Sequence, residues 1–251
     1  MNRSTLGWAA RRQIRRLRAA LGRDPQFSER HVVYLPKANL AYIRIPKAAN
    51  TSIRTALAAA FDLVETDSLV PNRDRFWVDL DETKAQALTH QAFQAHRADQ
   101  NLWCFSFVRH PLSRLYSCWE NKVIQNDQLG RVFQNMGVKT GMSFDAFVEC
   151  VAKTPDDFCD IHVQSQASLL VHNGVLVPDF VGRVENIDQD WAYVRSQCRE
   201  LIGVELGALP KKNVRAQIQP EIASDVSKET LERIKIRYAA DFKLFYSAEK
   251  L

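Results

Sequence analysis

The chain of 251 residues contains nine glycines, and none of them lies between Leu40 and Phe61. This gap excludes the loop G-x-x-x-x-G-K-[ST] of nucleoside-triphosphate-binding proteins from a stretch that otherwise has the pattern of a strand followed by a helix. The five cysteines are scattered and never form a C-x-x-C pair. An odd number of scattered cysteines is typical of free thiols in a reducing compartment, and not of disulfides or a zinc site.

Long apolar runs are also absent. No stretch reaches the length of about eighteen apolar residues that a membrane-spanning helix needs, and the chain does not start with an apolar signal segment. We therefore expect a cytoplasmic protein. The formal net charge of +5 suits an anionic ligand. It is too small to indicate nucleic-acid binding, and no motif for it is present.

The first residues are rich in arginine. Residues 8–23 contain no acidic side chain, and apolar residues at helical spacing predict an amphipathic helix over residues 1–24. Two interpretations are open: a solvated terminal helix, or a helix that contacts a membrane surface or an acidic glycan. The Asp24-Pro25 pair then separates this extension from a single domain over residues 25–251.

A strand, a tight loop and a helix are predicted between Leu40 and Phe61. The strand, Leu40–Ile45, is rich in β-branched and aromatic residues. The helix is expected from Ile53, with Thr51 or Ser52 as its N-cap. Its first amides, the helix dipole and Lys47 would meet at one point, which favours a bound phosphate or sulfate. The alternative is an ordinary turn with a surface lysine.

A second junction of the same kind follows the most apolar stretch of the chain. Residues 102–108 predict a central strand covered on both faces, and hence a parallel sheet flanked by helices. The pattern R-x-P-x-x-R-x-x-S then begins a helix to about residue 126, with Arg109, Pro111, Arg114 and Ser117 at its fixed positions. Arg109 and Ser117 can contact one anion from two sides, whereas Arg114 either joins them or braces the helix.

Two histidines lie in a stretch, Glu82–Ala98, that favours a helix. His90 and His96 are six positions apart, so they do not share a helical face as zinc ligands would. No metal site is expected. Further along, residues 187–201 predict an amphipathic helix, and an apolar stripe from Leu231 to Phe245 predicts a final helix.

The two junctions together carry a resemblance to a known family. The order P-K-x-x-x-T-S at Pro46–Ser52 resembles the 5'-phosphosulfate loop of sulfotransferases that use 3'-phosphoadenosine 5'-phosphosulfate (PAPS), with the spacing of the carbohydrate (Golgi-type, family 2) branch. The pattern at Arg109–Ser117 resembles the 3'-phosphate-binding motif of the same enzymes. Weaker similarity extends the resemblance over residues 39–246, through the blocks Asp160–Gln166, Asp179–Ile187, Leu209–Asn213 and Arg237–Phe245.

This resemblance implies an α/β, P-loop-like three-layer fold with a mainly parallel central sheet. It also implies transfer of a sulfuryl group from PAPS to a hydroxyl of a carbohydrate or glycolipid acceptor, without a metal and with adenosine 3',5'-bisphosphate as product. Lys47 would neutralise the leaving phosphate oxygen. The residues implied to bind the cofactor are Lys47, Ala48, Ala49, Asn50, Thr51, Ser52, Arg109 and Ser117, with Arg183 and Lys212 as further candidates.

The resemblance also implies a catalytic base. His90 stands 19 residues before Arg109, at about the place of the base of uronyl-type glycan sulfotransferases, and the pKa of an imidazole suits that role. The alternative is a histidine on the polar face of a helix, and His96 and Glu185 are further candidates for the base.

Departures from the family pattern reduce the range of possible acceptors. The glycine-rich R-K-G-x-x-G-x-x-K motif of the cytosolic small-molecule branch is absent, which disfavours steroid or phenol acceptors. Ile53 stands where that branch has an aromatic residue on the nucleotide, so the residue that stacks on adenine stays open. Two other classes of function also stay open: a P-loop-type nucleotide kinase, and a non-catalytic nucleotide- or partner-binding module.

Overall fold

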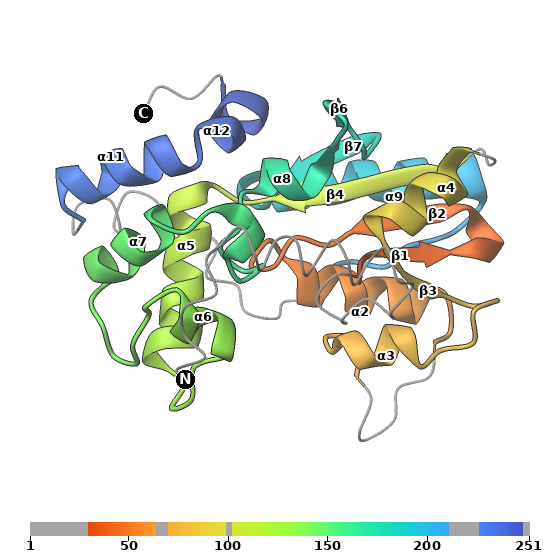
Figure 1. Cartoon of the computed structure of the whole chain (residues 1–251). Coiled ribbons are helices and arrows are strands. Elements are labelled where there is room, and N and C mark those ends of the chain that lie inside the picture. The colour runs from red at the N-terminus through yellow and green to blue at the C-terminus, as the bar shows by residue number, and fades with distance from the viewer. Residues whose placement is uncertain (1–29, 64–69, 99–101, 211–225, 248–251) are drawn as a thin grey trace.

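The computed structural model of the chain describes residues 30–63, 70–98, 102–210 and 226–247 (Figure 1). The helix expected over residues 1–24 and the candidate residue Lys212 lie outside these ranges. The described residues form a mixed α/β structure, in which helices flank a five-stranded sheet. This confirms the α/β class expected from the sequence.

The central sheet has the strand order β3-β1-β2-β4-β7. β2, β4 and β7 run parallel, whereas β1 is antiparallel to both of its neighbours, β2 and β3. β3 therefore points the same way as β2, and the carboxyl ends of β2, β3, β4 and β7 lie at one edge of the sheet. The bounds are β1 Arg30–Leu35, β2 Leu40–Ile43, β3 Gln86–Thr89, β4 Trp103–Val108 and β7 Phe180–Arg183.

Helices cover both faces of this sheet because its strands are apolar on both sides. On one face, Tyr42 and Phe105 pack against α2, α3 and α9, whereas Ile43 and Cys104 on the other face pack against α4 and α8. Successive residues of β2 thus enter different cores, as strand geometry requires. The bounds are α2 Asn50–Ala60, α3 Asp74–Val78, α4 His90–Ala98, α8 Gln166–Leu170 and α9 Ile187–Ile202.

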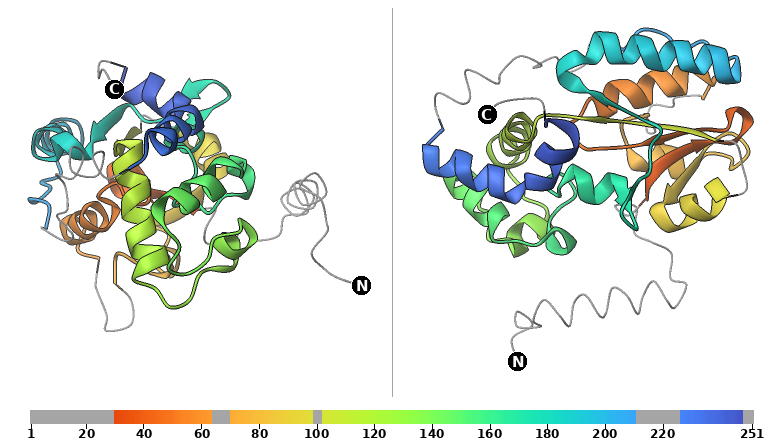
Figure 2. Two further views of the ribbon diagram at one scale, coloured as in Figure 1. Left: turned by 90° about the vertical axis from the view of Figure 1, so that its left-hand side faces the viewer. Right: turned by 90° about the horizontal axis from the view of Figure 1, so that it is seen from above.

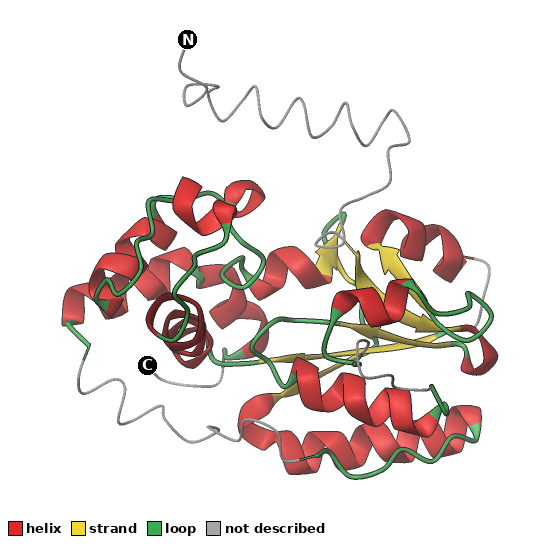
Figure 3. Cartoon of the chain, turned by 90° about the horizontal axis from the view of Figure 1, so that it is seen from below, coloured by secondary structure: helices red, strands yellow, loops and turns green. Residues whose placement is uncertain are grey.

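A group of helices beyond the carboxyl ends of the strands forms a second core, which we call the helical lobe (Figures 2 and 3). It contains α5, the π-helical turn η3, α6, α7 and α11, and α12 continues from it to the sheet. The bounds are α5 Pro111–Trp119, η3 Glu120–Ile124, α6 Arg131–Asn135, α7 Phe144–Ala152, α11 Lys228–Arg237 and α12 Ala239–Phe245.

Short elements complete the described chain. A 3-10 turn, η2, joins β1 to β2, and its last turn is closed by Asn39 in the left-handed region at φ 45°. Two more 3-10 turns precede α8 and α9, and a small hairpin follows α8. The bounds are η2 Pro36–Ala38, η4 Asp156–Phe158, η5 Val184–Asn186, β5 Val171–His172 and β6 Val175–Leu176.

Three expectations about the elements were wrong in part. The stretch Glu82–Ala98 is not one helix, because β3 occupies Gln86–Thr89 and α4 begins only at His90. The helix after Pro111 changes to π geometry at Glu120. The final helix is two helices, α11 and α12, which meet at Tyr238. Tyr238 is only 1% exposed, so the junction between the two helices is packed into the core.

The contact between β4 and β7 depends on a glycine. A Cβ at Gly182 would lie 2.5 Å from Cε1 of Phe107, a distance at which the ring would have to move. Phe107 is fully buried and is paired in register with Gly182. The glycine therefore lets Phe107 lie flat on β7, and this contact sets the position of the strand end at Arg183.

Candidate functional site

Three cationic residues stand at the ends of three adjacent parallel strands. Lys47 follows β2, Arg109 follows β4, and Arg183 ends β7, where it lies in register with Val108 of β4. Nη1 of Arg109 lies 3.5 Å from the carbonyl oxygen of Lys47. The structure thus brings the two sequence motifs together at the edge of the sheet where ligands of parallel strands bind.

The loop after β2 reaches this edge through backbone that is unusual for its residues. Lys47 and Ala49 have positive φ angles of 68° and 55°. For residues with a side chain this conformation costs about 1–2 kcal/mol, and such positions are common at functional sites. Ala48 between them is fully buried and its amide donates to Ile45 at 3.2 Å, which holds the loop in place.

The start of α2 differs from the expectation. The helix begins at Asn50 and its N-cap is Ala49, whereas Thr51 and Ser52 lie in the first turn and provide no cap. With the left-handed Ala49 as its N-cap, the helix begins earlier in the chain than it would with Thr51 or Ser52 as the N-cap. The first intrahelical bond is donated by Ile53 to Ala49, so the amides before Ile53 have no acceptor within the helix. These amides and the helix dipole still favour an anion beside Lys47.

Lys47 is held by a residue that the sequence did not single out. Its Nζ donates to Oδ1 of Asn121 at 2.6 Å. Asn121 belongs to η3, and π-helical turns are frequent at functional sites. Burial lowers the pKa of Lys47 to about 8, and the charges of Lys122 and Arg109 act in the same direction. A bound anion stabilises a cation that burial has destabilised more than it stabilises a cation in water.

Arg109 is fixed by a buried clamp on its backbone. The amide of Arg109 donates to Oε1 of Gln166 at 2.9 Å, and Nε2 of Gln166 donates back to the carbonyl of Arg109 at 2.8 Å. The carboxylate of Asp241 in turn accepts from the amides of Gln166 and Ala167, at 3.0 and 2.7 Å. Gln166 and Asp241 are fully buried. Burial lowers the pKa of Arg109, and the charge of Glu185 opposes this shift.

Glu185 has a structural task that argues against its use as a base. One of its oxygens accepts from the amide of His110 at 2.8 Å, and the other accepts from the hydroxyl of Tyr246 at 3.1 Å. The ring of Tyr246 also lies under the guanidinium of Arg183, 5.7 Å from its centroid. Glu185 and Tyr246 thus support the strand ends that carry Arg109 and Arg183.

Arg114 braces the structure and does not face a ligand. It is 1% exposed, and its three nitrogens donate to three backbone carbonyls. Nε reaches Pro46 at 3.0 Å, Nη1 reaches Gln164 at 2.7 Å and Nη2 reaches Ile161 at 3.1 Å. This resolves the alternative that the sequence left open for Arg114. Ser117 lies half-buried one turn further along α5.

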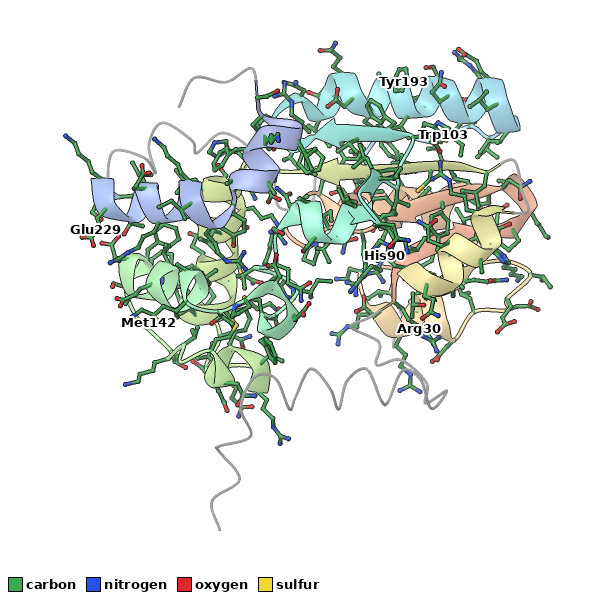
Figure 4. The ribbon with its side chains drawn as sticks, turned by 45° about the horizontal axis from the view of Figure 1, so that its top comes forward. Arg30, His90, Trp103, Met142, Tyr193 and Glu229 are labelled. Carbon is green, nitrogen blue, oxygen red and sulfur yellow. The ribbon has the colours of Figure 1, made fainter. Side chains whose placement is uncertain are left out.

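The two histidines from the sequence lie by β3 and β1. His90 begins α4 at the end of β3 (Figure 4). Its ring centroid is 6.1 Å from that of His31. Burial and the charge of His172 lower its pKa, opposed by a backbone hydrogen bond at Leu169. His96 packs edge-on against Tyr34 at 4.6 Å between centroids. In the sheet, β1 lies between β3, which precedes His90, and β2, which precedes Lys47.

The chemistry of the site is that of an anion receptor. Its side-chain donors are a desolvated ammonium and guanidinium groups, and its backbone donors are the amides at the start of α2. This set fits phosphate and sulfate oxygens and so fits PAPS. Within the described ranges, no group of three or more His, Cys, Asp and Glu residues could hold a metal ion. No helix in the same ranges is long and apolar enough to cross a membrane.

Fold and site together define an α/β protein with a cationic site, suited to an anion, at the carboxyl edge of adjacent parallel strands. The family-2 model of the sulfotransferase family matches residues 30–247, and the chain belongs to this family. Membership supports sulfuryl transfer as the general reaction and agrees with the resemblance of the two motifs. Comparison with curated proteins and with solved structures found no match.

Proposed function

We propose that this protein is a PAPS-dependent sulfotransferase that sulfates a hydroxyl of a carbohydrate or glycoconjugate. The observation that carries the proposal is the meeting of Lys47 and Arg109 at neighbouring strand ends, linked by the contact of Arg109 with the carbonyl of Lys47. One cationic group at each end of a single nucleotide suits a donor that carries anionic groups at both its 3' and 5' positions.

Each part of the site has a role in this proposal. Lys47 and the amides of Ala49, Asn50, Thr51 and Ser52 hold the phosphosulfate, and Lys47 stabilises the charge that develops on the leaving phosphate oxygen. Ala48, whose amide donates to Ile45, shapes the loop around them. Arg109 and Ser117 hold the 3'-phosphate, and Arg183 adds positive charge beside them. The strand-loop-helix arrangement at β2 and α2 supports a P-loop-like fold in which the lysine precedes the turn.

The attacking hydroxyl must also lose a proton, and we assign this task to a histidine because a neutral imidazole accepts protons near neutral pH. The sequence put forward His90, which follows β3 at the same edge of the sheet. The proposed acceptor, a sugar hydroxyl, rests on the family branch that the loop resembles. All five cysteines are unpaired thiols, which supports the proposed cytoplasmic location.

Nucleotide binding separates the proposal from its rivals. We expect adenosine 3',5'-bisphosphate to raise the melting temperature without magnesium, because the site offers only cationic and amide donors. ATP with magnesium should give a smaller rise. A larger rise with ATP and magnesium would favour a nucleotide kinase. Binding of the bisphosphate without transfer of labelled sulfate from PAPS to any of a panel of polysaccharides and simple glycosides would favour a non-catalytic module.

A further inference from the structure

A histidine-aspartate pair lies in the loop before α8. Nδ1 of His162 is 2.6 Å from Oδ1 of Asp160, and the same oxygen accepts from the backbone amide of His162 at 3.0 Å. These hydrogen bonds lower the pKa of Asp160 against the effect of burial, so the carboxylate is ionised and can only accept. Nδ1 therefore carries the proton of the neutral ring, and Nε2 keeps its lone pair.

The loop that carries this pair is tied to the loop that carries Lys47. The guanidinium of Arg114 donates both to the carbonyl of Pro46 and to the carbonyl of Ile161. Lys47 and His162 are the next residues after these two carbonyls. A single buried side chain thus ties together the backbone just before Lys47 and the backbone just before His162, although the two residues are 115 positions apart in the sequence. The charge of Lys47 also acts on the His162 ring.

Burial favours the neutral His162 ring. It lowers the pKa of the ring against Asp160, which raises it, and the charges of Lys122 and Lys47 lower it further. The buried thiol of Cys118, which adjoins Lys47 and Asp160, stays neutral because burial raises its pKa to about 12. About a quarter of the His162 side chain remains exposed, at 27%.

His90 lacks each of these features. β1 lies between β3 and β2, which puts His90 roughly 10 Å from the axis of the strand before Lys47. Nε2 of His90 is buried and finds no hydrogen-bond partner among the described residues. Its ring makes a backbone hydrogen bond at Leu169, and no carboxylate among the described residues contributes to its pKa.

On this basis, and resting on the proposed sulfotransferase function, we propose that His162 is the general base and that Asp160 positions it. Nε2 of His162 takes the proton of the acceptor hydroxyl while the hydroxyl oxygen forms its bond to sulfur. The bond from sulfur to the bridging phosphate oxygen breaks, and that oxygen keeps the electron pair beside Lys47. The imidazolium then releases its proton to water. Asp160 keeps Nδ1 protonated throughout.

The first test compares histidine variants with labelled PAPS and whichever polysaccharide or glycoside of the panel the parent protein sulfates. His162→Gln should lower kcat by about 100-fold or more, which is the usual contribution of a general base. The affinity for adenosine 3',5'-bisphosphate should stay within threefold, and this binding also shows that the variant is folded. His172→Gln, at an exposed position of β5, serves as the control and should retain parental kcat. A near-parental kcat for His162→Gln, or a larger loss for His90→Gln, overturns the assignment.

The second test separates a base from a merely structural histidine. In the parent, kcat should fall at low pH as His162 becomes protonated, and this limb should disappear in His162→Gln. Asp160→Asn should lower kcat and move the limb to lower pH, because the imidazolium loses its anionic partner. An unmoved limb in Asp160→Asn overturns the positioning role.

A third readout needs no acceptor. The nuclear magnetic resonance titration of the His162 ring should move to higher pH when adenosine 3',5'-bisphosphate binds, since the negative charge of the bisphosphate faces Lys47. If the bisphosphate binds and His162 does not respond, the base assignment alone fails. If the bisphosphate does not bind, the proposed function fails and the assignment falls with it.

Discussion

The two strand-to-helix junctions place a cation at the same edge of the sheet by different means. After β2, the loop itself is unusual: Lys47 and Ala49 adopt left-handed backbone, and Asn121 holds the lysine from a π-helical turn. After β4, the backbone is ordinary and the support comes from the buried Gln166 and Asp241. The first junction therefore combines local strain with an exposed hydrogen bond to Asn121, whereas the second depends on a buried network.

This difference predicts different responses to mutation. Changes of the Lys47 side chain should affect the chemical step and leave the fold intact, because its hydrogen bond to Asn121 is exposed. Changes behind the second junction should affect stability first, because its support is fully buried. The following predictions, from the largest expected effect to the smallest, test this contrast.

Lys47→Ala should lower kcat by roughly 100- to 1,000-fold, the usual loss when a preorganised charge-stabilising donor is removed. Turnover with labelled PAPS is the measurement. Lys37→Ala is a closely matched control, because Lys37 occupies the same Pro-Lys-Ala sequence in η2 and lies at the opposite end of β2. Equal losses in the two variants would contradict a specific role for Lys47.

Asp241→Ala should destabilise the fold by about 3 kcal/mol, because two buried amides and the Gln166 side chain lose their acceptor. Urea unfolding is the measurement. Asp127→Ala, at an exposed loop position, should change stability by less than about 0.5 kcal/mol. If Asp241→Ala unfolds like the parent, Arg109 does not depend on this network.

Arg109→Ala should weaken the binding of adenosine 3',5'-bisphosphate by about 10- to 100-fold, since charge-assisted hydrogen bonds contribute about 1.5–3 kcal/mol each. Isothermal titration calorimetry measures this, with adenosine 5'-phosphate as the second ligand. The parent should prefer the bisphosphate and the variant should lose the preference. Arg75→Ala, whose side chain is 75% exposed, should keep it.

Binding of adenosine 3',5'-bisphosphate should also weaken as pH rises through about 8, the pKa of the unliganded Lys47. The sign follows from the lowered pKa: Lys47 is charged below that value, neutral above it, and stabilised in its charged form by a bound anion. The affinity can fall by at most about tenfold per pH unit. Lys47→Arg should remove the dependence, because a guanidinium stays charged. A parental slope in Lys47→Arg would assign the titration to another group.

The sequence predicted the parts of the site that depend on local pattern. Lys47 and Arg109 were found because each stands where an apolar strand gives way to a helix, and both signals are short in range. The start of α2 was missed because Ala49 adopts a backbone conformation for which alanine has no propensity. β3 was missed because Gln86-Ala87-Leu88-Thr89 has little β-branched content and is a strand only through its pairing with β1.

The supporting residues were not predictable from local pattern, because they depend on contacts between distant segments. Asp241 meets Gln166 across 75 positions, and Lys47 meets Asn121 across 74. The pair of Asp160 and His162 is local, but its closeness to Lys47 exists only through Arg114. A buried arginine with three carbonyl partners has no signature in the sequence that distinguishes it from a phosphate-binding arginine.

The left-handed alanine before α2 sets a limit for protein engineering. Ala49→Gly would relieve an unfavourable φ angle, and selection for heat resistance would therefore favour it. The same substitution would let the loop adopt other conformations, and the ammonium group of Lys47 would then occupy a wider range of positions. Variants selected for thermal tolerance at this position should consequently have a lower kcat. The melting temperature and kcat therefore cannot both be raised by a substitution at Ala49.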